Sequence, residues 1–152
     1  MIDENDVLLK LSLPLYILHG SKKKKFILNL NNYPNIHYSA LNNCKKLWKD
    51  MVRNMIPSNA YRIPDTTKVK AIFIYYATSK RLIDVSNPCC VIDKFTMDAV
   101  VSAGILVDDN IKHVTDVQYK YGGVDRKNPR CDFFLVKQPN KGYNPSCSSH
   151  CG

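Results

Sequence analysis

The fold is decided by the stretch Val69-Lys70-Ala71-Ile72-Phe73-Ile74-Tyr75-Tyr76 and by the apolar segment that follows it, from Cys89 to Ala103. The first stretch is rich in β-branched and aromatic residues, which predicts a central strand over 69–77. The second predicts a helix from about residue 88 to 103, ended by Gly104. The expected buried stripe of this helix comprises Val91, Ile92, Phe95, Ala99 and Ala103.

Acidic residues flank this predicted helix. Asp84 precedes it, and the pair Asp108-Asp109 follows it. Carboxylates at the ends of a strand and a loop can converge across the top of a helix. Converging carboxylates attract Mg²⁺, which takes oxygen ligands and keeps several waters. In a chain of net charge +9, such an acidic cluster indicates a metal-dependent site inside a protein that binds a polyanion.

The remaining sequence predicts an α+β fold, with a small mixed sheet packed with two main helices. A basic loop from His19 to Lys25 is expected to join two strands, and Ser86 or Asn87 is expected to cap the helix that starts at Pro88. Apolar spacing predicts the other helix. The other expected elements are strands within 7–18, interrupted at Pro14, and 26–30, a helix over Tyr38 to Met55, strands over 111–121 and 131–136, and a turn over 122–130. We expect one domain over 1–137 and a loose tail over 138–152.

The chain of 152 residues holds 22 Lys and Arg against 13 Asp and Glu, and its pI is about 9.3. Such an excess of positive charge favours a nucleic-acid partner, because each neutralised phosphate releases condensed counterions. Ordinary solvated loops and helix faces are the alternative interpretation of the same residues. The candidate contacts to the DNA backbone are Lys22, Lys23, Lys24, Lys25, Lys80, Arg81, Arg126, Lys127 and Arg130.

The first residues are acidic, and no apolar run approaches the ~20 residues that span a bilayer. We therefore expect a cytoplasmic protein without a membrane partner, whose six cysteines are mostly reduced. Cys147, His150 and Cys151, with Cys131 as a fourth ligand, are a weaker candidate for zinc. An unstructured tail is the alternative.

Residues 81–109 resemble the RusA family of Holliday junction resolvases, and the wider resemblance covers about 100 residues. The order and spacing of the pieces carry this resemblance, rather than any piece alone. The matching pieces are Asp84-Val85-Ser86-Asn87, Asp93-Lys94-Phe95, Asp98-Ala99-Val100, Ala103-Gly104 and Asp108-Asp109.

The resemblance implies a small α+β homodimer that cleaves four-way DNA junctions with Mg²⁺, or with Mn²⁺ in its place. Carried over by position, Asp84 matches the first catalytic aspartate, Asp109 the one after the helix, and Lys94 the catalytic lysine. The second family aspartate is Ser86 here, and about four extra residues follow Asp84, so Asp93 or Asp108 is expected to replace it. The implied catalytic set is Asp84, Asp93, Lys94 and Asp109, and the implied metal ligands are Asp84, Asp93, Asp108 and Asp109.

Plainer interpretations stay open beside this one. Asp84 and the pair Asp108-Asp109 also fit ordinary turn chemistry, and Lys94 and Asp98 have the spacing of a helix ion pair. A branched-DNA-binding protein without catalytic activity is the alternative function, with Ser86 marking a lost ligand. A small zinc-dependent accessory protein organised by its tail is a third.

Overall fold

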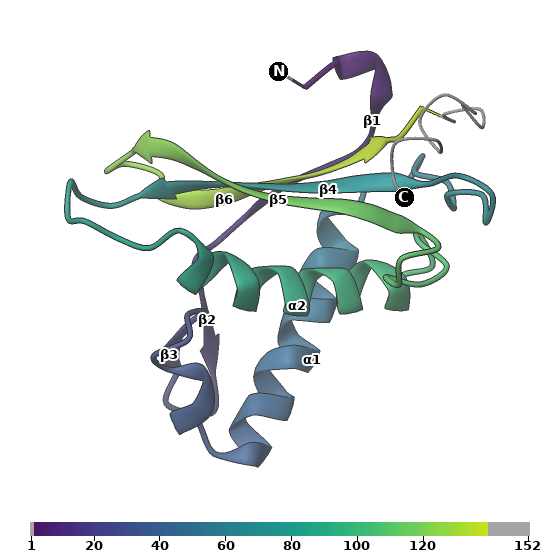
Figure 1. Cartoon of the computed structure of the whole chain (residues 1–152). Helices are drawn as coiled ribbons and strands as arrows, with labels where there is room; N and C mark the ends of the chain where they lie inside the picture. Colours follow the sequence, from purple (N-terminus) through teal and green to yellow (C-terminus); the bar gives the residue numbers. More distant parts are fainter. Residues whose placement is uncertain (1, 140–152) are drawn as a thin grey trace, which may run out of the picture.

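The computed structural model describes residues 2–139, which form an α+β fold (Figure 1). A mixed four-stranded sheet of order β1-β6-β4-β5 is accompanied by a two-stranded hairpin, β2-β3, and by two α-helices. The elements are η1 (Glu4–Asp6), β1 (Val7–Leu13), β2 (Tyr16–His19), β3 (Lys24–Ile27), η2 (Tyr33–Asn35), α1 (Tyr38–Met55), β4 (Val69–Ala77), α2 (Ser86–Ser102), β5 (Val114–Val124) and β6 (Arg130–Lys137).

Strand β4 lies inside the sheet, as its apolar sequence predicts. It pairs antiparallel with β6 and parallel with β5. A parallel pair cannot be closed by a tight turn and needs a crossover connection, which here contains α2. The unit β4-α2-β5 therefore fixes where residues 69–124 lie relative to the sheet.

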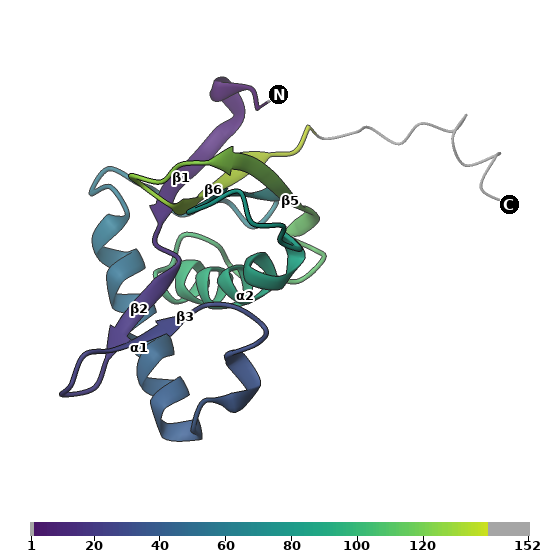
Figure 2. The ribbon, with the colours of Figure 1, turned by 90° about the vertical axis from the view of Figure 1, so that its left-hand side faces the viewer.

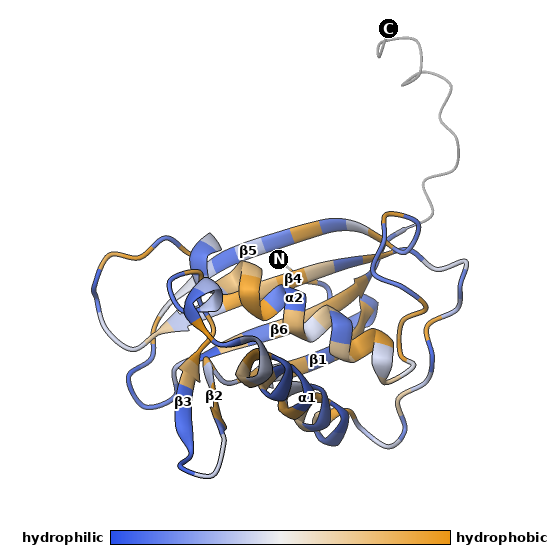
Figure 3. Ribbon diagram, turned by 90° about the horizontal axis from the view of Figure 1, so that it is seen from below, coloured by the Kyte–Doolittle hydropathy of each residue, from blue (hydrophilic) through white to orange (hydrophobic). Residues whose placement is uncertain are grey.

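Both helices and the hairpin lie on one side of the sheet (Figures 1 and 2). Helix α1 buries only Cys44, Trp48 and Val52, and much of its surface seen from below is hydrophilic (Figure 3). Helix α2 buries eight side chains, because it is packed between the sheet and α1. Helix α2 is therefore the central element of the core.

An aromatic cluster joins α2 to the elements around it. The Phe95 ring stands 6.3 Å, centroid to centroid, from each of the rings of Phe26, Tyr33 and Trp48. These partners come from β3, η2 and α1, so one ring of α2 contacts three separate elements. Beside this cluster the indole N–H of Trp48 donates a 3.1 Å hydrogen bond to the Thr96 hydroxyl, and both residues are fully buried.

Several predicted elements are confirmed and others need correction. The helix Tyr38–Met55 and the strand Val69–Ala77 have the predicted bounds, and Gly104 ends α2 at φ 79°. The predicted cap of α2 is wrong: the helix begins at Ser86, and Val85 occupies the N-cap position. The Asp84 carboxylate accepts hydrogen bonds from the Ser86 amide and hydroxyl, which stabilises a first turn that begins two residues before Pro88.

The strand boundaries also differ from expectation. The apolar run 7–18 splits at Pro14 into β1 and β2, which belong to different sheets. Strand β5 begins later than predicted, at Val114, and runs on to Val124 through Gly122 and Gly123. Of the predicted stripe of α2, Ala103 lies past the helix and is only half-buried, whereas the other four residues are buried.

Among residues 2–139, no helix is both long enough and apolar enough to cross a membrane. Most of the predicted tail, residues 140–152, lies outside the described residues.

Replacing Thr96 by Val is expected to destabilise the protein by about 1–3 kcal/mol, because the shape is kept while the buried Trp48 N–H loses its acceptor. Chemical denaturation followed by Trp48 fluorescence measures this. The control is Thr115→Val on the exposed surface of β5, for which a change within about 0.5 kcal/mol is expected. Equal stability of the two variants would contradict the role of this hydrogen bond.

Candidate functional site

The crossover decides where the predicted site residues lie. Because β4 and β5 are parallel, α2 runs back along the sheet, and its two ends lie at opposite ends of these strands (Figure 1). A helix of 17 residues is about 25 Å long. Asp84 precedes one end, and Asp108 and Asp109 follow the other. Within residues 2–139, these three carboxylates do not form a group that could hold a metal ion, so the expected convergence across the top of the helix is not formed.

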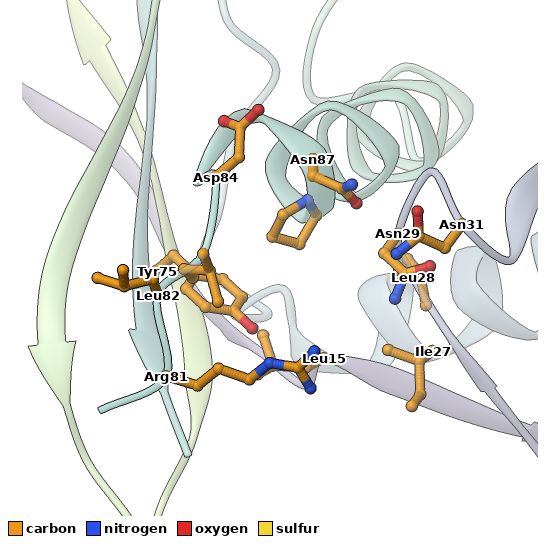
Figure 4. Close-up of a pocket in the computed structure, with 12 residues that line it drawn as sticks. Leu15, Ile27, Leu28, Asn29, Asn31, Tyr75, Arg81, Leu82, Asp84 and Asn87 are labelled. Atoms are coloured by element: carbon orange, nitrogen blue, oxygen red, sulfur yellow. The ribbon is translucent and has the colours of Figure 1, made fainter. Parts of the chain in front are cut away.

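Asp84 is an exposed residue with a local structural role. Its Oδ1 atom accepts hydrogen bonds from the Ser86 amide, at 3.1 Å, and from the Ser86 hydroxyl, at 2.7 Å. Ser86, which stands where the resembling family has an aspartate, thus binds the carboxylate beside it. Asp84 also borders a cleft, but its carboxylate points away from the centre of that cleft (Figure 4).

Asp93 is the most deeply placed of the predicted carboxylates. Its Oδ2 atom accepts a 2.6 Å hydrogen bond from the Tyr119 hydroxyl on β5. Burial raises the pKa of the Asp93 carboxyl; the bond from Tyr119 lowers it, and the charges of Asp109 and Asp98 raise it. The pKa of the Tyr119 phenol is raised far above its ordinary value by burial and by Asp93. A perturbed carboxylate on a charged surface is a typical feature of functional sites.

Asp109 belongs to the same acidic neighbourhood through the loop after α2. Partial burial, a side-chain hydrogen bond with Asp108 and the charge of Asp98 raise its pKa. Asp108 turns back on its own loop: its Oδ1 accepts from the Asp109 amide at 2.8 Å, and its Oδ2 accepts from the Asn110 side chain at 3.0 Å. The loop therefore brings Asp109 within electrostatic range of Asp93, whereas Asp108 mainly shapes the turn.

The predicted metal ligands provide the oxygen chemistry that Mg²⁺ prefers, but they do not gather into one group. No three Asp, Glu, His or Cys side chains within residues 2–139 are placed so that they could hold a metal ion. Asp84 bonds to Ser86, Asp93 to Tyr119, and Asp108 to its own loop. The four-carboxylate arrangement expected from the sequence is thus not formed in this structure.

Lys94 lies on a different face of α2 from its neighbour Asp93. Its ammonium group stands over the Tyr33 ring, 5.3 Å from the centroid, and the neighbouring Tyr33 phenol is the main cause that raises the pKa of Lys94. No ion pair of 4.0 Å or less joins Lys94 to Asp98 within the described residues. The helix ion pair considered for this spacing is not formed.

The predicted DNA contacts form an exposed basic surface, with one exception. Lys22–Lys25 occupy the hairpin, Lys80 and Arg81 the loop after β4, and Arg126 and Lys127 the β5–β6 turn. Arg130 is the exception.

The Arg130 guanidinium donates to Asp125 and Asp132 at 2.9 and 3.0 Å, and it stacks over the Tyr76 ring at 4.1 Å. Its charge is therefore compensated within the protein. The interpretation of Arg130 as a free DNA contact needs correction to a structural role that holds the β5–β6 turn.

The zinc candidate is only partly inside the described residues. Cys131 is fully buried on β6, and its pKa is raised by the neighbouring Cys89 thiol and by burial, so it behaves as a core thiol. Cys147, His150 and Cys151 lie outside the described residues.

The sequence did not reveal which side chain of the sheet binds Asp93. Tyr119 donates the hydrogen bond that holds Asp93, and the alternation of β5 indicated only that this strand has two distinct faces. Sequence reasoning also missed a cleft of about 350 Å³ in which Asn29, Asn31 and Asn87 meet Tyr75 and Arg81 (Figure 4). Asn87 comes from a segment far in sequence from Asn29 and Asn31, so no local motif indicates their meeting.

No protein-family model matches the sequence, and no match is found among curated proteins.

Replacing Asp93 by Asn is expected to raise stability near pH 8. Because burial raises the pKa of Asp93 on folding, its ionised form opposes folding, and this penalty grows as pH rises from the ordinary carboxyl pKa to the raised one. The asparagine side chain would remove the charge and keep an acceptor for Tyr119. The gain should shrink towards about pH 4, where the carboxyl is protonated.

Thermal unfolding across that pH range measures the difference, with Asp50→Asn on the exposed surface of α1 as the control. A stability loss for Asp93→Asn at high pH would mean that the ionised carboxylate supports the fold.

Proposed function

We propose that this protein is a structure-specific endodeoxyribonuclease that acts on branched DNA, with four-way junctions as the main substrate. The observation that carries the proposal is the half-buried Asp93, whose carboxylate accepts a 2.6 Å hydrogen bond from the Tyr119 hydroxyl and feels the charge of Asp109, sixteen positions further along the chain. Both residues lie in the segment 81–109 that resembles the RusA resolvases. Burial is the main cause that raises the pKa of both carboxyls, and perturbed carboxyls are typical of functional sites.

The charge distribution supports a polyanionic substrate. The chain carries a net charge of +9, and cationic side chains occupy the hairpin, the loop after β4 and the β5–β6 turn. Lys80, Arg81 and Lys127 make no ion pair within residues 2–139, so their charges are available for phosphates. These contacts would position branched DNA without reading its sequence.

In this proposal the residues have distinct tasks. Asp93, held by the Tyr119 hydroxyl, would accept the proton of the attacking water, and Asp109 would keep the pKa of Asp93 raised. Lys94 is exposed and would meet a phosphate that approaches from the Tyr33 side. A homodimer would present two such sites to the two opposed strands of a junction.

A metal requirement, for Mg²⁺ or Mn²⁺, is implied by the resemblance and is part of the proposal, although the described residues do not assemble a three-ligand site. That same observation favours the second candidate function. In this second function the protein binds branched DNA without cutting it. Ser86, whose hydroxyl donates a hydrogen bond to Asp84, then marks a lost metal ligand.

Cleavage of an end-labelled synthetic four-way junction separates the two functions. Wild-type protein is expected to cut it with Mg²⁺ or Mn²⁺ and to bind it without cutting in EDTA. Asp93→Asn should lower the cleavage rate by about 100-fold or more, as expected for loss of a proton-transfer group. Asp109→Asn should lower the rate less, because Asp109 acts through Asp93. Binding in EDTA should stay unchanged for both.

The matched control is Asp50→Asn, which makes the same charge change on α1 and should cut normally. A wild type that binds the junction tightly but never cuts it with either metal would exclude the enzyme and favour the binding protein.

A further inference from the structure

Two clefts at one end of the sheet adjoin and form a single groove. The first, of about 350 Å³, and the second, of about 540 Å³, share Leu15, Ile27 and Tyr75 in their linings. The groove is bounded by the hairpin β2-β3, the end of β4, the β5–β6 turn and the start of α2. It lies at the Asp84 end of α2, and neither Asp93 nor Asp109 is among its lining residues.

The charged residues of this groove are mainly basic. Its linings include Lys25, Arg81, Lys127 and Arg130, against a single carboxylate, Asp84. Arg130 is compensated by acids outside the groove, and Asp84 is bound to Ser86. The remaining three cations have no ion-pair partner within the part of the chain that the structure describes. The groove thus has unneutralised positive charge along its walls.

The inner surface of the groove suits flat, partly apolar groups. Leu15 is half-buried, the side chain of Ile27 is 42% exposed, and the Tyr75 ring lies in the cleft between Arg81 and Asn87 (Figure 4). Bases stack on such surfaces when they are unpaired, because every base offers a π-face. A paired duplex keeps its base faces covered by neighbouring base pairs and offers only its grooves and phosphates.

Amide groups line the end of the groove near α2. The Asn87 Oδ1 accepts from the Leu30 amide at 2.9 Å, and the Asn29 Oδ1 accepts from the Asn32 amide at 2.9 Å. These bonds fix both side chains, while their NH₂ groups make no hydrogen bond within residues 2–139. Fixed amide donors are groups that can contact base edges.

We propose that this groove binds a short unpaired segment of DNA, with bases over Leu15, Ile27 and Tyr75 and phosphates against the cationic walls. The inference deepens the proposed function, on which it rests for the choice of DNA: among four-way junctions and other branched molecules, those that carry unpaired nucleotides next to the branch are preferred. Combining an apolar and aromatic surface with cationic walls is the usual way in which proteins hold single strands.

Fluorescence anisotropy in EDTA tests this without cleavage, so failure of the nuclease proposal does not affect the result. The probe is a labelled oligothymidine, and its matched partner is an oligomer of the same length with abasic sugars. Wild-type protein should bind oligothymidine about tenfold or more tightly than the abasic oligomer, since stacking contributes about 1–3 kcal/mol per base. A labelled blunt duplex of the same length should bind more weakly than oligothymidine.

The double variant Arg81→Ala/Lys127→Ala should lower the affinity for oligothymidine about tenfold and reduce the salt slope by roughly 1.4, as expected for two lost phosphate contacts on a single strand. Both residues are exposed, so the fold should survive. The control Lys46→Ala/Lys112→Ala removes the same charge from exposed positions outside the groove and should change affinity less than about twofold.

Equal losses of affinity in the two double variants would contradict binding in the groove and indicate general electrostatic binding. Equal affinity for the abasic and the thymidine oligomers would contradict base stacking in the groove. Tighter binding of oligouridine than of oligothymidine would overturn the assignment to DNA.

Discussion

The parallel pairing of β4 with β5 is the constraint on which the rest of the structure depends. It requires a crossover, and α2 fills that crossover on the side of the sheet where α1 also lies. Phe95 and Thr96 then fix α2 to α1 through Trp48. Because both ends of α2 are set by this pairing, every residue of the segment 81–109 has a determined place along the sheet.

This constraint separates two chemical regions. Asp84, Arg81 and Asn87 lie at the start of α2, beside a groove with basic walls. Asp93 and Asp109 lie along the helix and after it, where burial and neighbouring acidic groups raise the pKa of both carboxyls. One region therefore suits the holding of a polyanion, and the other suits proton transfer. In the proposed function, a branched DNA substrate would reach both regions.

Several charged side chains at the turns form hydrogen bonds or ion pairs with neighbouring groups of the protein. Asp108 bonds within its own loop, and Arg130 joins Asp125 and Asp132 across the β5–β6 turn. Such contacts shape the backbone that carries neighbouring functional groups. The side chains without such partners, including Arg81 and Lys127, are consequently the better candidates for contact with a nucleic acid.

Local sequence by itself determined the elements: periodicity predicted the helix Tyr38–Met55, and β-rich composition predicted the strand Val69–Ala77. The order and spacing of short motifs also singled out Asp93 and Asp109 as candidate site residues. Only the tertiary structure decided which acids meet, because the direction of α2 depends on strand pairing between distant residues. The Tyr119 bond to Asp93 and the groove around Tyr75 likewise arise from packing across the sheet, which no local pattern encodes.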